Sequence, residues 1–230
     1  MWTRTVNGRV LHFYLAGINN QNFLMRDRET GTWWQQITGK ALYGPLRGTA
    51  LELVLSDELS FGQWRSESPN GQVLAPVAKY TKEYDPNWEP DVAKLPVVIS
   101  FPGTELNSRD VVIGLTLNGA ARAYPWETFA KQSPIVDRVN GTPLLLVLGP
   151  DGKSFRVFLS RIDGRDAEFF LQGDTKEWML IDSTTASQWN IQGCATSGPA
   201  HGKCLDRIPA LKDYWFDWRN YHPETTVYKH

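Results

Sequence analysis

The stretch Gly44–Leu51, which reads GPLRGTAL, decides the fold because it returns later in the chain as Gly198–Leu205, GPAHGKCL. The same spacing along the chain relates Trp64 to Trp218. Glycine, proline and tryptophan carry most of these matches, and such residues fix turns and large packing contacts. Their recurrence in the same order predicts two diverged copies of one structural unit.

The repeat continues upstream with one residue of slippage, which relates Asp27 to Asp182 and Trp34 to Trp189. We therefore divide the chain into three parts: a first repeat, a proline-rich ordered linker and a second repeat, at residues 1–75, 76–110 and 111–230.

The second repeat opens with a leader, residues 111–160, and the first repeat has no equivalent of it. Two explanations compete. Either the chain is a truncated form of a longer protein, or the first repeat borrows strands from elsewhere. We expect truncation.

Turn dipeptides dominate the rest of the pattern. Asn-Gly and Asp-Gly supply the positive φ angles of type I′ turns, which join antiparallel strands. They occur at Asn7-Gly8, Asn70-Gly71, Asn118-Gly119, Asn140-Gly141, Asp151-Gly152 and Asp163-Gly164. Helical periodicity is brief and predicts short helices within Phe61–Glu67, Trp126–Lys131 and Ala210–Asn220. The predicted fold is mainly β, with two pseudo-symmetric antiparallel β lobes from an internal duplication and short connecting helices.

Composition excludes several classes of function. The net charge is −1 and the basic residues are scattered, which argues against a nucleic-acid partner. No apolar run approaches the roughly 18 residues of a membrane span, so we expect no transmembrane segment. The start of the chain has no signal-peptide pattern, and no motif indicates a cofactor.

Three segments together resemble the bacterial domain of unknown function 3179 family. They are Asp27–Ala41, Gly44–Gly48 and Val112–Pro125. The resemblance implies no established activity. It does imply an exported protein, and family members often carry paired cysteines and a histidine in the leader. This leader lacks those groups, because Val147–Gly152 stands where the cysteines are expected.

A candidate ligand site lies in the first repeat, where amides cluster beside aromatic residues. Such clusters suit a pocket that orients a polar, uncharged ligand such as a sugar or peptide. The alternative is that the amides satisfy the backbone of turns. The candidate residues are Asn19, Asn20, Asn22, Asp27, Trp34, Gln36 and Thr38.

Cys194 and Cys204 are the only cysteines, and three interpretations stay open. A disulfide across the turn between them suits an exported protein. Two free buried thiols suit the cytoplasm. A soft-metal site could add His201 as a third ligand, although the spacing is loose.

No residue has the sequence context of a catalyst, and the recurring aspartates Asp27 and Asp182 fit turns better than acid–base chemistry. Whether the protein is an enzyme stays undecided. We predict a non-catalytic, exported domain that binds a small polar ligand or a protein. The alternative is an enzyme or metal- or redox-linked protein whose active groups lie in a missing N-terminal segment. The expected location is extracytoplasmic if the chain is truncated and cytoplasmic otherwise.

Overall fold

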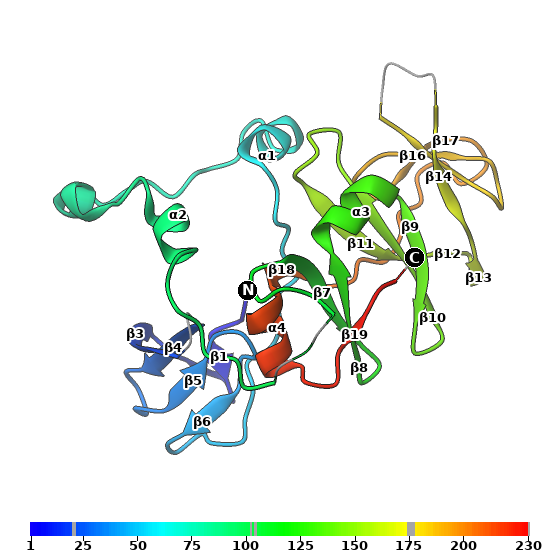
Figure 1. Ribbon diagram of the computed structural model, residues 1–230. Helices are drawn as coiled ribbons and strands as arrows, with labels where there is room; N and C mark the ends of the chain where they lie inside the picture. The colour runs from blue at the N-terminus through cyan, green and yellow to red at the C-terminus, as the bar shows by residue number, and fades with distance from the viewer. Residues whose placement is uncertain (20–21, 102, 104, 174–177, 230) are drawn as a thin grey trace. The chain divides into compact units, whose positions relative to one another are not determined.

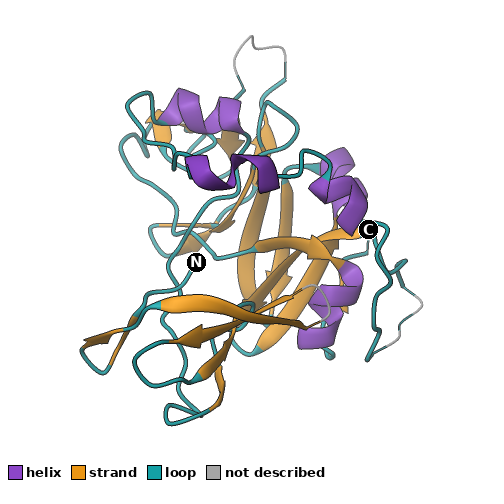
Figure 2. Cartoon of the chain, turned by 90° about the vertical axis from the view of Figure 1, so that its left-hand side faces the viewer, coloured by secondary structure: helices purple, strands orange, loops and turns teal. Residues whose placement is uncertain are grey.

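The computed structural model describes residues 1–19, 22–101, 103, 105–173 and 178–229, and strands are its main regular structure (Figure 2). The chain divides into two compact units. The first comprises Met1–Ser56 with Val97–Ser100, and the second comprises Asp57–Pro96 with Phe101–His230. In the described part of the chain, none of the helices has the length and apolarity that a bilayer span requires.

The first unit consists of a short hairpin, β1–β2, and a four-stranded antiparallel meander in the order β3-β4-β5-β6 (Figure 1). The strands are β1 (Thr5–Val6), β2 (Arg9–Val10), β3 (Phe13–Asn19), β4 (Asn22–Asp27), β5 (Trp33–Gln35) and β6 (Ala41–Tyr43). Its core is small and is built around the Trp34 indole, which packs with Val6, Leu11, Ala41 and Leu51.

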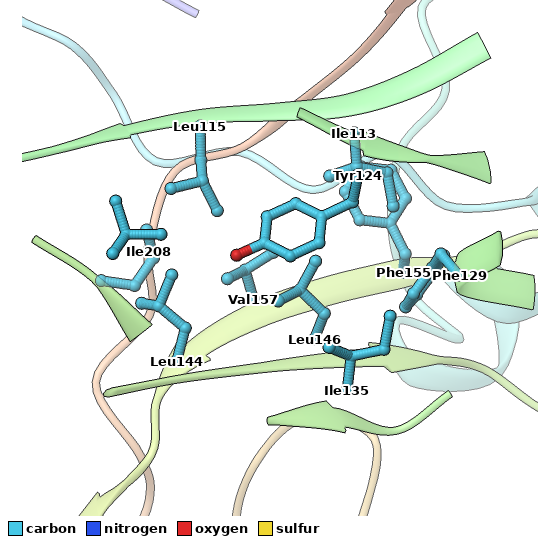
Figure 3. Packing of buried hydrophobic residues seen from close by; sticks show 11 residues of the cluster. Ile113, Leu115, Tyr124, Phe129, Ile135, Leu144, Leu146, Phe155, Val157 and Ile208 are labelled. Atoms are coloured by element: carbon cyan, nitrogen blue, oxygen red, sulfur yellow. The ribbon is translucent and has the colours of Figure 1, made fainter. Parts of the chain in front are cut away.

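Two sheets and their helices form the centre of the second unit. One sheet has the order β18-β7-β8-β19 and the other the order β11-β10-β9. The strands are β7 (Val111–Leu117), β8 (Ala120–Pro125), β9 (Ile135–Val139), β10 (Thr142–Leu148), β11 (Phe155–Leu159), β18 (Leu211–Tyr214) and β19 (Thr226–Val227). The helices here are α1 (Phe61–Glu67), α3 (Trp126–Gln132) and α4 (Trp215–Tyr221). Side chains from β7, β8 and the second sheet meet in one core, where the Tyr124 ring points among Leu115, Leu144 and Leu146 (Figure 3).

A second antiparallel meander, in the order β14-β15-β16-β17, follows the hairpin β12–β13. These strands are β12 (Arg161–Ile162), β13 (Arg165–Asp166), β14 (Phe169–Leu171), β15 (Leu180–Asp182), β16 (Gln188–Trp189) and β17 (Ala195–Ser197). Its core is again built around a buried indole, that of Trp189, which packs with Leu145, Phe158 and Phe169.

The turn dipeptides behave as predicted at four of the six positions, where both residues have positive φ: Asn7-Gly8, Asn118-Gly119, Asn140-Gly141 and Asp163-Gly164. The Asp163-Gly164 hairpin is short, because Phe155–Leu159 pairs with β10 and leaves only two residues on each side of the turn.

The predicted helices at Phe61–Glu67 and Trp126–Lys131 are confirmed. The helix predicted within Ala210–Asn220 is confirmed only for the second part of that range, because Leu211–Tyr214 pairs with β7 and α4 begins at Trp215. In the linker region the structure has a 3-10 helix (Ala78–Glu83) and α2 (Trp88–Val92), and the apolar run Val97–Ser100 forms no strand.

The two meanders share their strand order and several local features. Both have an irregularity in register at a tryptophan, between Trp33 and Trp34 in the first and between Gln188 and Trp189 in the second. Both are closed by an isolated antiparallel bridge, Lys40–Ala50 in the first and Cys194–Cys204 in the second. In both, a positive-φ glycine lies directly against an aromatic ring: Gly39 against Trp2, and Gly193 against Phe158. A Cβ at either glycine would lie less than 3 Å from that ring.

Candidate ligand-binding face

Asp27 and Trp34, two of the predicted ligand residues, lie in the core of the first meander with no exposed surface. The Trp34 Nε1 donates to Asp27 Oδ2 at 2.8 Å, and the Thr30 backbone N–H donates to Asp27 Oδ1 at 2.6 Å. The carboxylate and the indole therefore satisfy each other and the β4–β5 turn.

The electrostatics of Asp27 agree with this structural role. Burial alone would raise the pKa of its carboxyl, but the hydrogen bonds from Trp34, Thr30 and the Thr32 backbone outweigh burial and lower the pKa below its usual value. Asp27 is thus an ionised anchor of a turn.

The predicted residues Gln36 and Thr38 lie in the turn between β5 and β6. The backbone oxygen of Gln36 accepts a 2.6 Å hydrogen bond from Trp2 Nε1. The Thr38 hydroxyl donates to Gln35 Oε1 at 2.9 Å and accepts from the Lys40 backbone at 3.3 Å. These bonds match the alternative in which polar groups serve the turns.

Asn19 and Asn22 face each other across the end of the β3–β4 hairpin. Asn19 is exposed and Asn22 is buried, and Asn20 falls outside the described residues. The structure therefore brings Asn19 and Asn22 together, but it places Asp27 and Trp34 in the core of the sheet instead of in a shared pocket.

The opposite face of the same meander carries a row of side chains that the sequence analysis missed. Cross-strand pairing aligns Tyr14 with Arg26, Arg26 with Trp33, and Trp33 with Tyr43. Directly paired residues project from the same face of an antiparallel sheet and lie side by side. We call these four residues the aromatic row.

The aromatic row holds three aromatic side chains and one cationic side chain, and all four are at least partly exposed. Tyr43 is 71% exposed and Tyr14 is 39% exposed, while Arg26 and Trp33 are half-buried. The Arg26 guanidinium lies 5.7 Å from the centroid of the Trp33 ring, a cation–π contact. Its Nε also donates to the Gly31 oxygen at 3.0 Å, which holds the guanidinium in place.

A glycine keeps the Trp33 ring open. A Cβ at Gly17 would lie 3.9 Å from the edge of the Trp33 ring and 4.0 Å from the Leu24 Cβ, so a larger side chain at this position would cover the indole. The pairing of Leu24 with Gln35 places the Gln35 amide on the same face as the aromatic row. Gln35 is itself buried and its Oε1 accepts from Thr38, so the exposed part of the face consists of flat rings and one fixed cation.

The second meander has the same register but different chemistry at the matching positions. There Phe170 pairs with Ile181, Ile181 with Gln188, and Gln188 with Ser197. Ser197 and Gln188 bond to each other through Oγ and Oε1 at 2.8 Å. The aromatic row is therefore a property of the first meander and not of the meander fold.

A signal for the aromatic row existed in the sequence. Consecutive residues of a strand point to opposite faces, so Trp33 and Trp34 had to lie on opposite sides of the sheet. The buried indole is Trp34 because its partner is Asp27, and the exposed indole is Trp33. Which tryptophan is which depends on the pairing with β4, and that information is not local.

Cys194 and Cys204 are joined by a disulfide bond in the structure. The bond spans the bridge that closes the second meander, and His201 lies in the turn that follows β17. Within the described residues, no three His, Cys, Asp or Glu side chains gather in a way that could hold a metal ion.

The fold and the candidate face together define a mainly β protein with two four-stranded meanders, one of which exposes an aromatic row. The chain belongs to the family described as protein of unknown function DUF3179, whose model matches residues 1–225. No curated protein and no solved structure matches it.

Proposed function

We propose that this protein is an extracytoplasmic, non-catalytic glycan-binding protein, and that the aromatic row of the first meander holds the glycan. The observation that carries the proposal is the alignment of two exposed tyrosines, a half-buried tryptophan and a fixed guanidinium on one face of a sheet.

The chemistry of this face suits sugar rings. A pyranose has C–H faces that stack on aromatic rings, and its edge carries hydroxyls that accept from a guanidinium and exchange hydrogen bonds with phenols. Because neighbouring strands lie roughly 4.8 Å apart, a row across four strands extends for about 14 Å. That length fits a chain of several sugar units better than a single monosaccharide.

The disulfide supports an extracytoplasmic location for this function. Disulfides persist in oxidising compartments and are rare in the cytosol. The protein has one disulfide and, among its described residues, no free cysteine. A glycan-binding role outside the cytoplasm is consistent with this redox state.

We further propose that the two meanders arose by internal duplication. Support comes from their common strand order, from the matched bridges Lys40–Ala50 and Cys194–Cys204, and from the two helices α1 and α4 that follow them. After duplication, the first copy acquired the aromatic row and the second acquired the disulfide. In this proposal the two copies and the linker between them occupy residues 1–75, 111–230 and 76–110. The compact units of the structure are divided differently, because the first unit ends at Ser56 and also includes Val97–Ser100.

The test is direct binding to defined oligosaccharides. Isothermal titration with hexamers of cello-, xylo-, chito- and malto-series sugars should reveal saturable binding to at least one series. Tyr43→Ala should weaken this binding at least tenfold without changing the unfolding midpoint, because the side chain is mostly exposed.

Phe170→Ala is the matched control, since Phe170 occupies the Tyr14 position of the second meander and is 52% exposed. It should leave the affinity unchanged. Failure of every glycan series, equal loss with Phe170→Ala, or tighter and salt-dependent binding to oligo(dT) would each refute the glycan assignment.

A further inference from the structure

Helix α1 has two faces with different chemistry, and one of them is fully engaged. Its N-cap Ser60 donates through Oγ to Asp151 Oδ2 at 2.5 Å, and its backbone N–H donates to Ser154 Oγ at 2.9 Å. At the other end of the helix, Glu67 accepts from the buried Arg156 at 2.6 Å. Polar contacts thus attach this face to the hairpin of β10 and β11.

The other face of α1 is apolar and open. Phe61 is 65% exposed and its ring lies 5.5 Å from that of Trp64, which is half-buried. No residue of α1 is buried, and the apolar residues Val73 and Leu74 that follow the helix are 65% and 95% exposed. Monomeric proteins seldom leave such a group of large apolar side chains in water without use.

Helix α4 shows what the same motif looks like when its apolar face is covered. Trp215 and Trp218 take the positions of Phe61 and Trp64, and they are only 2% and 3% exposed. The helices also end alike. The Ser68 N–H donates to the Trp64 oxygen at 2.8 Å and the His222 N–H to the Trp218 oxygen at 2.9 Å, with closely similar backbone angles at both caps.

The β7–β8 hairpin is the cover of α4. Val112 and Ala123 from its two strands pack with Trp215 and Trp218 in one buried cluster. Gly114 of β7 lies so close to the Trp218 ring that a Cβ there would be 2.3 Å away. The strand before α4, β18, pairs with β7, and the strand after it, β19, pairs with β8. The strand–helix–strand unit β18–α4–β19 thus pairs through both of its strands with the β7–β8 hairpin, and the apolar face of α4 packs against that hairpin.

Around α1 the helix and its two flanking segments are present, but among the described residues no hairpin covers them. Residues 57–60 precede the helix and residues 72–73 follow it, at the positions of β18 and β19, and neither segment forms a strand. The Ser60 N–H and oxygen are already bonded, to Ser154 Oγ and the Trp64 N–H, and the remaining backbone groups of such segments can pair with an added strand.

We propose that α1 and its flanking segments 57–60 and 72–73 form a docking site for a β-hairpin of a partner polypeptide. The hairpin would add one strand to each segment and lay its apolar face, with a glycine opposite Trp64, over Phe61 and Trp64. The inference goes beyond glycan binding and rests on the equivalence of α1 and α4. The alternative occupant is a second copy of this chain, packed α1 against α1.

A cyclised peptide with the sequence of Val111–Pro125, closed by a D-Pro-Gly turn and labelled with fluorescein, is a suitable probe because it is preorganised as the hairpin. Fluorescence anisotropy with the full chain should show saturable binding. The double variant Phe61→Ser with Trp64→Ser should bind at least tenfold more weakly while keeping the wild-type unfolding midpoint.

Two controls separate docking at α1 from other events. The same peptide with Gly114→Val should bind at least tenfold more weakly. A Cβ at Gly114 would lie 2.3 Å from the Trp218 ring, and in the proposed docking Trp64 takes the place of Trp218. The protein variant Phe170→Ser removes an aromatic ring that is also more than half exposed, at 52% against 65% for Phe61, and it should bind normally. No binding by the wild-type chain, equal binding by the double variant, or a dimer in light scattering that Phe61→Ser dissociates would overturn the proposal.

Discussion

The indole Nε1 of Trp34 donates a 2.8 Å hydrogen bond to Oδ2 of Asp27, a carboxylate with no exposed surface. The second meander repeats this pair, with Trp189 donating to Asp182 at 2.9 Å. Both aspartates also receive backbone N–H groups of the turn that follows them. Each meander is therefore organised around one ionised, buried turn anchor that orients one indole.

Removal of either anchor should destabilise its own meander. Asp182→Ala leaves the Trp189 indole and three backbone N–H groups without their acceptor, so we expect a loss of about 2–4 kcal/mol in the free energy of unfolding. Hydrogen exchange read by mass spectrometry should show faster exchange in β14–β17. Asp27→Ala should instead accelerate exchange in β3–β6. Uniform acceleration in both meanders by either variant would contradict the idea of two separate anchors.

The sign of the pH dependence follows from the same pairs. Burial raises the pKa of Asp182, but bonds from Thr185, Trp189 and Ser187 outweigh it, so the net pKa is lowered. A lowered pKa in the folded state contributes stability above the ordinary pKa, and this stability is lost as the pH falls through the folded value. The Asp182→Ala variant should therefore lose less stability than the wild type during acid titration.

Local sequence patterns predict much of the fold, but they do not predict where the candidate site lies. Asn-Gly turns and the helix Phe61–Glu67 depend on neighbours in the sequence, and they were found. Leu211–Tyr214 is a strand because β7 offers it a partner, and no local pattern shows that partner. Asp27 and Trp34 were predicted as ligand residues because a binding site and a buried turn can contain the same polar and aromatic residue types.

Reduction of the disulfide should lower stability without abolishing the fold. Cys194 and Cys204 close a short loop, and loss of that constraint costs about 2–3 kcal/mol. The first meander forms the matching bridge between Lys40 and Ala50 without sulfur, so the backbone arrangement does not require the bond. Urea unfolding with and without dithiothreitol should show a lower midpoint on reduction. The variant Cys194→Ser with Cys204→Ser serves as the control, and its unfolding midpoint should be the same with and without dithiothreitol. An unchanged wild-type midpoint would contradict the prediction.

The free energy of unfolding should fall as the pH rises, because of the neighbouring carboxyls of Asp213 and Asp217. Burial, the charge of Asp217 and the nearby Glu58 raise the pKa of Asp213 to about 8. Oδ2 of Asp213 is buried and, among the described residues, receives no bond from an N–H or hydroxyl group. A hydrogen bond to Asp217 therefore requires one of the two carboxyls to keep its proton.

A raised pKa gives stability that is complete at low pH and is lost as the pH rises through about 8. Each pH unit over which only the unfolded carboxyl is ionised costs about 1.4 kcal/mol. Asp213→Asn keeps the shape of the protonated acid, so its free energy of unfolding should fall less than that of the wild type between pH 4 and pH 8. Glu224→Gln, which changes an exposed carboxylate before β19, should follow the wild type. Parallel curves for Asp213→Asn and the wild type would rule out the shared proton.

Arg156 should control the attachment of α1 to the β10–β11 hairpin. Its guanidinium is almost fully buried and donates to Glu67 at 2.6 Å and to Asp57 at 2.9 Å. Burial alone would raise the pKa of Glu67, but the bonds from Arg156 and Gln63 lower it, so the carboxylate is ionised and needs its partner. Arg156→Met leaves Glu67 without its cation and Asp57 with only Arg207, and it should cost about 3 kcal/mol.

Limited proteolysis measures this attachment directly. In Arg156→Met, cleavage between residues 57 and 75 should accelerate at least tenfold while the core strands β7 to β11 stay protected. Arg207→Met removes only the more exposed second partner of Asp57, so its effect should be smaller. Adding Glu67→Leu to Arg156→Met removes the carboxylate that has lost its cation and should restore part of the lost protection, because the two residues form one buried pair. Equal cleavage rates in wild type and Arg156→Met would show that α1 is held by Ser60 and its contacts with Asp151 and Ser154 instead.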